Sequence, residues 1–287
     1  MNKSQTKYKK AFFLSISSDI ASYIALKLLE EGTEIHGTFR TSSDTTEKLR
    51  VKGAHLYKLN CFNSSEIEEL FKEGARYKDW DLAMISPATG LPINRFDLCD
   101  WKEWEDSFSM NSLRQFQVIH RLLPLRSKKD PFLFLWSGPG TNNAPKNYSA
   151  LTTAKIAQIK MCELLDAEFE DLRSTIVGPG WVNTKGHKET LQAKNTSGEN
   201  YQRTLNRINS DNTTSLERIY DFFKWCSSQE KSVVSGRNFS IQGDIWGDDS
   251  LNTHLLSSAN AFKMRRFDND WKPNEQKTSF EPPKYKL

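Results

Sequence analysis

Hydrophobic residues follow two distinct patterns along this chain, continuous short runs and a spacing of four residues. Short apolar runs at 11–14 and 131–136 contain no polar residue, which is typical of strands buried on both faces of a parallel sheet. After the first run, Ile20, Ile24 and Leu28 recur every four residues, the spacing of an amphipathic helix. This pattern predicts a strand followed directly by a helix.

The same alternation continues to about residue 241. It predicts seven strands, at 11–14, 34–39, 54–59, 81–85, 131–136, 174–177 and 239–241. The longest helices are expected at 104–123, 150–169 and 216–225. Strand–helix–strand repeats with short connections indicate an α/β fold, a single Rossmann-like doubly wound domain whose parallel sheet of about seven strands is flanked by helices.

We assign residues 1–287 to this one domain. Within it, the lysine-rich segment 1–9 is expected to be a flexible arm, and 268–287 a tail. The polar stretch 185–212 has little apolar periodicity, so we expect a mobile lid or an exposed insertion there, near the substrate.

Composition narrows the class of protein. A chain of 287 residues with 37% hydrophobic and 26% charged residues is typical of a globular protein with a sizeable core. The net charge of +4 comes without a basic stripe, so no nucleic-acid partner is expected. Four dispersed cysteines and the lack of an apolar run of about 18 residues predict reduced thiols, no membrane span and a cytoplasmic location. The five histidines show no metal-ligand spacing, so no metal site is predicted.

In doubly wound sheets, ligands bind beyond the carboxyl ends of the strands, where the strand order reverses. The turn after the first strand is therefore expected to meet a phosphate, because backbone N–H groups and the helix dipole converge there. The turn here, 14–21, contains no glycine and does not fit the generic dinucleotide motif.

Residues 10–185 nevertheless resemble the short-chain dehydrogenase/reductase family. Ser15, Asp19 and Ala21 stand at the three glycines of its first turn, while Asn111 and the segment 178–184 match the family's own residues. The resemblance implies cofactor contacts from Ser15, Ser17, Ser18, Asp19, Ile20, Arg40, Asn60, Ala88, Lys155, Pro179, Gly180 and Thr184. Arg40 stands where members that prefer NADP carry a basic residue, and a plain surface arginine is an equal alternative. NADP or NAD is the implied cofactor, with weakened or lost binding left open.

The resemblance also implies a catalytic set. In the family, a serine polarises the substrate carbonyl, a tyrosine transfers the proton, a lysine lowers the tyrosine pKa and an asparagine holds a relay water. Lys155 and Asn111 match, but Leu151 occupies the tyrosine position and Gly138 the serine position, with Ser137 adjacent. Tyr148 lies seven residues before Lys155 and substitutes only if the helix is shifted. The implied catalytic candidates are Lys155, Asn111, Ser137 and Tyr148.

Two functions stay open at this point. Because leucine transfers no proton, which costs about 10² to 10⁴ in rate, the sequence favours a degenerate member, a pseudoenzyme candidate that binds a nucleotide-type small-molecule ligand or acts as a partner or scaffold. The alternative is an NADP-dependent oxidoreductase with a variant, tyrosine-independent mechanism. Its substrate is a sugar-like or other carbonyl or hydroxyl compound, and residues 262–267 are similar to tails of members associated with cell-surface polysaccharide synthesis. The family resemblance implies a homodimer or homotetramer, or a hetero-oligomer with an active relative, paired through helices around 104–125 and 150–169.

Overall fold

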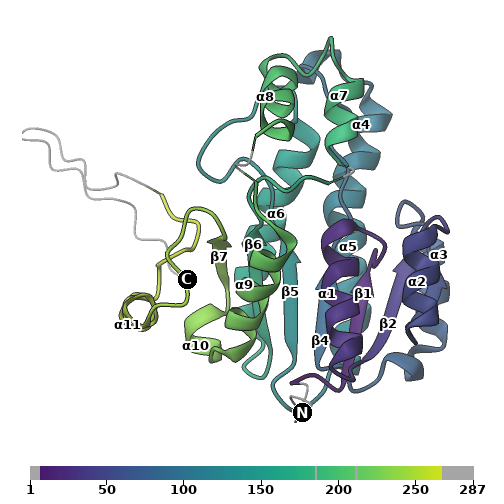
Figure 1. Ribbon diagram of the computed structural model, residues 1–287, viewed down its shortest axis with the longest axis vertical. Helices are drawn as coiled ribbons and strands as arrows, with labels where there is room; N and C mark the ends of the chain where they lie inside the picture. The colour runs from purple at the N-terminus through teal and green to yellow at the C-terminus, as the bar shows by residue number, and fades with distance from the viewer. Residues whose placement is uncertain (1–6, 185, 211–212, 267–287) are drawn as a thin grey trace, which may run out of the picture.

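The structure, a computed structural model, describes residues 7–184, 186–210 and 213–266. Its centre is a parallel sheet of seven strands in the order β3-β2-β1-β4-β5-β6-β7 (Figure 1). The strands are β1 (Lys10–Leu14), β2 (Glu34–Phe39), β3 (His55–Lys58), β4 (Leu82–Ile85), β5 (Phe132–Trp136), β6 (Arg173–Gly178) and β7 (Arg237–Ser240). The predicted α/β fold with a parallel sheet of about seven strands is confirmed.

Helices cover both faces of this sheet. Those between the strands are α1 (Asp19–Glu30), α2 (Asp44–Val51), α3 (Ser64–Lys72), α4 (Trp101–Phe108), α5 (Arg114–Leu122) and α6 (Ser149–Glu168). Those that follow β6 are α7 (His187–Gln192), α8 (Glu199–Ile208), α9 (Leu216–Ser228), α10 (Lys231–Val234) and α11 (Asp249–Ser257). A single π-helical turn, Ser109–Leu113, joins α4 to α5, so the predicted helix at 104–123 is nearly continuous but not regular.

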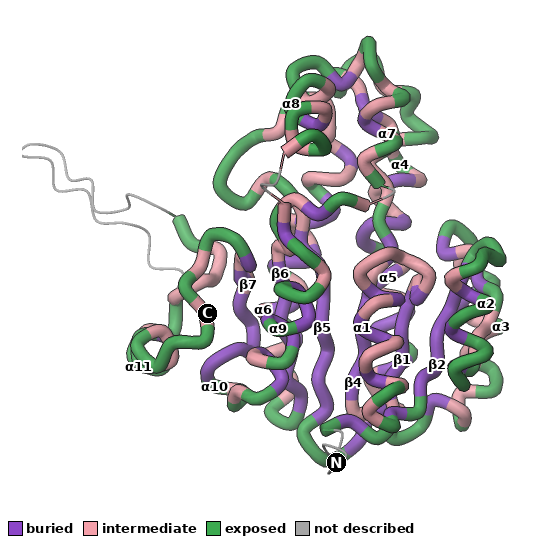
Figure 2. Tube along the Cα trace, in the orientation of Figure 1, coloured by how far each residue is buried: buried purple, intermediate pink, exposed green. Residues whose placement is uncertain are grey.

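Successive residues of β1 explain why two separate cores form. Phe13 joins the core that includes Ile24 of α1 and Phe222 of α9. Phe12, one residue earlier, faces the opposite core, which includes Val118 of α5. Residues 11–14 are all buried (Figure 2). Both faces of this strand are covered, which is why its sequence is apolar throughout and does not alternate between apolar and polar residues.

One predicted segment differs from the expectation, and another contains helices that were not predicted. Tyr8, inside the predicted arm, is buried with its ring centre 6.1 Å from that of Phe223; residues 1–6 and the tail 268–287 lie outside the described residues. The predicted lid contains α7 and α8, which rise above the sheet at the top of Figure 1. None of the helices in the described ranges is long and apolar enough to cross a membrane.

Candidate functional site

The strand order reverses between β1 and β4, which lie side by side at the middle of the sheet. The helix that follows β1 packs on one face and the helices that follow β4 on the other. In sheets of this kind, a ligand usually binds in the crevice at the carboxyl ends of these two strands. All the residues that the sequence singled out lie on segments that leave this edge or pack beside it.

The first turn is held tightly against β2. Ser15 has a φ of 60°, the left-handed conformation that a glycine adopts most easily. Its backbone N–H donates to Thr38 Oγ1 at 3.0 Å, and the N–H of Ile16 donates to the Thr38 carbonyl at 2.8 Å. The buried Ile16 side chain fills the space over Gly37, where a Cβ would lie 2.6 Å from Ile16 Cδ1. The turn thus keeps a glycine-like shape at Ser15 without a glycine.

The start of α1 offers both attraction and repulsion to an anion. Ser18 is the N-cap, and its Oγ accepts a hydrogen bond from the Ala21 N–H at 3.3 Å. The backbone N–H groups of a first helical turn are the usual partners of an anion at a helix N-terminus. The Asp19 carboxylate suits the helix dipole but opposes a phosphate at the same place. Ser17 is half-buried in the turn before α1.

The ends of β2 and β3 contribute two further predicted residues. Arg40 is exposed, and its guanidinium lies 6.0 Å from the centre of the Phe62 ring. Asn60 Oδ1 accepts a hydrogen bond from the Phe62 N–H at 3.2 Å, so this side chain stabilises a local turn. Burial raises the pKa of the neighbouring Cys61 to about 11, so Cys61 stays a thiol at neutral pH.

Asn111 lies on the π-helical turn and is fully buried. Its Oδ1 accepts from the Thr89 N–H at 3.1 Å, and its Nδ2 donates to the Thr89 carbonyl at 2.9 Å. This pair of bonds fixes the loop after β4, in which Ala88 is exposed. In this structure Asn111 therefore positions backbone.

Lys155 is buried inside the molecule. Its Nζ donates to the Trp136 carbonyl at 2.8 Å and to Gln158 Oε1 at 2.9 Å. Gln158 donates in turn to Gln115, and Gln115 donates to the carbonyls of Pro87 and Met110. Burial lowers the pKa of Lys155 to about 7. Lys155 thus begins a buried chain of amides between α6 and α5 that the sequence did not reveal.

The position of the family serine is coupled to this lysine. A Cβ on Gly138 would lie 2.9 Å from Lys155 Cγ, so the lysine side chain occupies the space that a serine would need. The adjacent Ser137 Oγ lies 3.2 Å from the place of a Cβ on Gly178 of β6. Leu151 is half-buried one helical turn before Lys155.

Tyr148 precedes α6, as predicted, and bonds away from Lys155. Its hydroxyl lies 2.8 Å from Thr190 Oγ1 on α7. Burial raises its pKa, so it is a protonated phenol at neutral pH. Tyr148 and Lys155 therefore have separate partners, and the structure does not join them into the family's tyrosine–lysine pair.

The lid helix α7 docks on the loop after β4. Glu189 accepts from the Gly90 N–H at 2.6 Å and from Thr89 Oγ1 at 3.1 Å. His187 stacks on Trp181 with ring centres 4.1 Å apart, and its Nε2 lies 2.8 Å from the Val182 carbonyl. His187 therefore has a packing role, with its ring held between Trp181 and the backbone. The sequence offered no signal for Glu189, whose partners lie about 100 residues away.

The segment that leads into α7 begins with Pro179 and Gly180. Gly180 has a φ of 76°, and a Cβ there would lie 2.6 Å from the Gln242 side chain, so both conformation and space require glycine. Thr184 is half-buried at the start of the lid. An open cleft of about 560 Å³ lies between the loop after β4, α4 and the lid, and its lining includes Thr89, Ser107 and Ala193.

No family model matches the chain. A 3-oxoacyl-[acyl-carrier-protein] reductase FabG from Buchnera aphidicola subsp. Schizaphis graminum is 24% identical over 83% of this chain and 97% of its own length. The rat dehydrogenase/reductase SDR family member 6 is 26% identical over 50% of this chain, and that match spans only 61% of the rat protein.

Solved structures share the fold. A short-chain dehydrogenase/reductase from Saccharomyces cerevisiae, YIR035C, superposes with a TM-score of 0.73 at 17% identity, covering 85% of this chain and 98% of its own. BdcA, solved in complex with NADPH, gives a TM-score of 0.66 at 14% identity over 81% of this chain and 92% of its own.

The relatives favour an oxidoreductase over the ligand-binding or scaffold role that the sequence favoured. Both of the sequence relatives described above are named as a reductase or as a member of a dehydrogenase/reductase family. The predicted resemblance is confirmed by these relatives and by the shared fold. In sequence and in fold, the chain is similar to the short-chain dehydrogenase/reductase family.

Proposed function

We propose that the chain is an NADP(H)-dependent oxidoreductase that acts slowly on a carbonyl or hydroxyl compound without the family's tyrosine. The observation that carries this proposal is the match to a reductase over 97% of that protein's length. Nicotinamide cofactor binding is drawn from relatives such as BdcA, whose structure contains NADPH.

The residues at the crevice fit a dinucleotide in part. Ser15 keeps the backbone shape of a glycine, and the N-terminus of α1 follows it, the kind of helix end that binds a pyrophosphate in this fold class. Arg40 follows β2 at the same edge and supplies a positive charge suited to a 2′-phosphate. The Asp19 carboxylate acts against this binding, so we expect weaker affinity than a glycine turn provides.

A bound nicotinamide would supply or accept a hydride. The protein's own contribution is to orient the reactants through the loop that Asn111 fixes and the lid that Glu189 holds. The Leu151 side chain has no exchangeable proton. The Lys155 ammonium already donates hydrogen bonds to the Trp136 carbonyl and to Gln158. The proton must therefore come from water or from a weak donor such as the Tyr148 phenol, which makes turnover slower by about 10² to 10⁴.

Cofactor titration tests the first half of this proposal. We expect calorimetry to show NADPH bound more tightly than NADH, and Arg40→Ala to remove that preference while the exposed Arg50→Ala leaves it unchanged. Absence of binding at millimolar NADPH would refute the proposal.

Gain of activity tests the second half. Leu151→Tyr is expected to raise the rate of NADPH oxidation with a panel of carbonyl compounds at least tenfold, because a phenol is restored four residues before Lys155. Leu151→Phe is the matched control, equal in shape but without the hydroxyl. If NADPH binds and neither the parent chain nor Leu151→Tyr turns over, the second candidate holds, a cofactor-binding protein without catalysis. The buried hydrogen bonds of Lys155 favour that candidate.

A further inference from the structure

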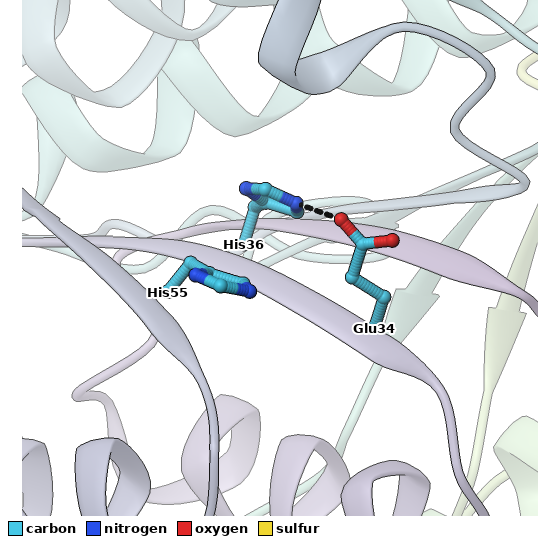
Figure 3. Close-up of side chains that lie close together, drawn as sticks. All are labelled: Glu34, His36 and His55. Carbon is cyan, nitrogen blue, oxygen red and sulfur yellow. Dashed lines mark hydrogen bonds and ion pairs between the residues drawn. The ribbon is translucent and has the colours of Figure 1, made fainter.

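Two histidines and a glutamate meet at the edge of the sheet opposite the crevice. Glu34 and His36 lie on β2, and His55 opens β3. His36 and His55 are paired residues in the parallel register, so their side chains project from the same face. Glu34 lies two residues before His36 and therefore shares that face. Figure 3 shows the two rings one above the other with the carboxylate beside them.

The ligand-type atoms of these three residues are close together. One from each, a carboxylate oxygen or a ring nitrogen, lies within 4.8 Å of the other two. Glu34 Oε1 is 2.6 Å from His36 Nε2, and the ring centres of His36 and His55 are 4.9 Å apart. Ligands of a tetrahedral zinc ion lie about 2.0–2.2 Å from the metal and hence roughly 3.3 Å from each other. Small rotations of side chains would bring this set into that range.

His36 is already oriented as a metal-bound histidine would be. It is 5% exposed, and its Nδ1 lies 3.0 Å from the Tyr57 hydroxyl on β3. An Nδ1 proton given to the Tyr57 oxygen leaves the lone pair of Nε2 directed at the shared space. Such an outer hydrogen bond fixes the tautomer and the ring plane of metal-bound histidines.

The other two ligands have the freedom that binding needs. His55 and Glu34 are exposed, so the His55 ring can turn from the stacked arrangement to direct a nitrogen at a shared ion. Lys10 Nζ lies 3.4 Å from Glu34 Oε1 and currently balances the carboxylate charge. Its flexible ammonium can move into solvent when a divalent cation takes its place.

We propose that Glu34, His36 and His55 form a binding site for a divalent d-block cation such as Zn²⁺. Two neutral imidazoles and one carboxylate are a ligand set that zinc accepts, with water in the fourth position. On binding, the ring proton of His36 moves from Nε2 to Nδ1 through exchange with solvent, so Nε2 is free to take the metal and Nδ1–H donates to the Tyr57 oxygen. The ion would link β2 to β3 at the outer edge of the sheet, independently of any cofactor at the crevice.

Titration of the full chain with Zn²⁺, after treatment with a chelator, tests this site. We expect one ion per chain by calorimetry and a melting temperature that rises with Zn²⁺ concentration. His55→Ala and Glu34→Gln change exposed side chains and are expected to weaken binding at least tenfold. Tyr57→Phe keeps all three ligands and is expected to weaken it by about tenfold through the lost outer hydrogen bond.

Two controls separate this site from adventitious zinc binding. His120→Ala removes an exposed histidine on α5, and Cys99→Ser removes a partly exposed thiol. Both variants are expected to bind Zn²⁺ as the parent chain does. Titration with Co²⁺ should give the visible spectrum of a nitrogen- and oxygen-ligated ion without thiolate charge-transfer bands. Binding that survives His55→Ala, binding lost with Cys99→Ser, or no binding at millimolar Zn²⁺ would each overturn the proposal.

Discussion

Lys155 is the residue whose chemistry departs most from what its position in the sequence implied. The family lysine contacts a cofactor, whereas this one donates to a carbonyl and an amide in the interior. Neither acceptor carries a charge, so nothing at hydrogen-bond distance compensates the desolvated ammonium. Burial therefore lowers its pKa from 10.5 to about 7.

This shift predicts a dependence of stability on pH. Between pH 7 and 10.5 the unfolded chain binds the Lys155 proton and the folded chain does not, so the free energy of unfolding rises with pH by up to about 1 kcal/mol per unit. Below pH 7 both states are protonated and this slope disappears. Denaturant titrations from pH 6 to 9 should show the slope in the parent chain, reduced in Lys155→Met. Lys160→Met, an exposed lysine of the same helix, should keep it; equal slopes in both variants would contradict the buried neutral amine.

At the scale of elements, the sheet could be predicted, whereas the two helices of the lid could not. Runs such as 11–14 are apolar throughout because both faces are covered, and this is visible in the sequence. Helices α7 and α8 are polar, and α7 is held by Glu189 on backbone about 100 residues away. The spacing of apolar residues along the chain carries no information about a contact between residues so far apart in sequence.

The candidate site could also be predicted only in part. The segments that approach the crevice could be located from strand ends and family motifs. The direction of each side chain could not, because it depends on distant partners: Gln158 meets Gln115, 43 residues earlier, and Tyr148 meets Thr190. The pairing of His36 with His55 likewise requires the strand register, which spacing along the chain does not give.

The lid contact can be tested alone. Glu189→Ala removes the acceptor for the Gly90 N–H and for Thr89 Oγ1, with a local cost of about 1–3 kcal/mol. Hydrogen exchange of residues 187–208 is expected to accelerate roughly tenfold or more, while exchange in the strands stays unchanged. Lys188→Ala, an exposed neighbour, serves as the control. Unchanged exchange in Glu189→Ala would mean that the lid is held by other contacts.

At the scale of the whole molecule, the outer sides of α4, α6 and the turn after α4 carry exposed apolar side chains. Trp101 is 63% exposed, Leu113 50% and Leu164 44%. Trp101 stacks on Trp104 with ring centres 5.4 Å apart, which keeps the exposed indole fixed in place. Exposed apolar groups on adjacent elements are a common feature of protein–protein interfaces.

We therefore expect this face to pair two copies of the chain. Light scattering should give a dimer or tetramer mass, and Trp101→Asp should halve it. Val51→Asp changes an apolar residue that is 77% exposed on α2 and should leave the mass unchanged. A parent chain that is monomeric at micromolar concentration would exclude this pairing.

The contact between Gly138 and Lys155 has a consequence for any attempt to rebuild a full catalytic set. A serine side chain at 138 would start 2.9 Å from Lys155 Cγ, so it cannot be introduced while the lysine keeps its present rotamer. Releasing the lysine first requires another donor for Gln158. The order of substitutions is therefore constrained: the interior amide chain has to be redesigned before the serine is added, and the reverse order passes through a destabilised intermediate variant.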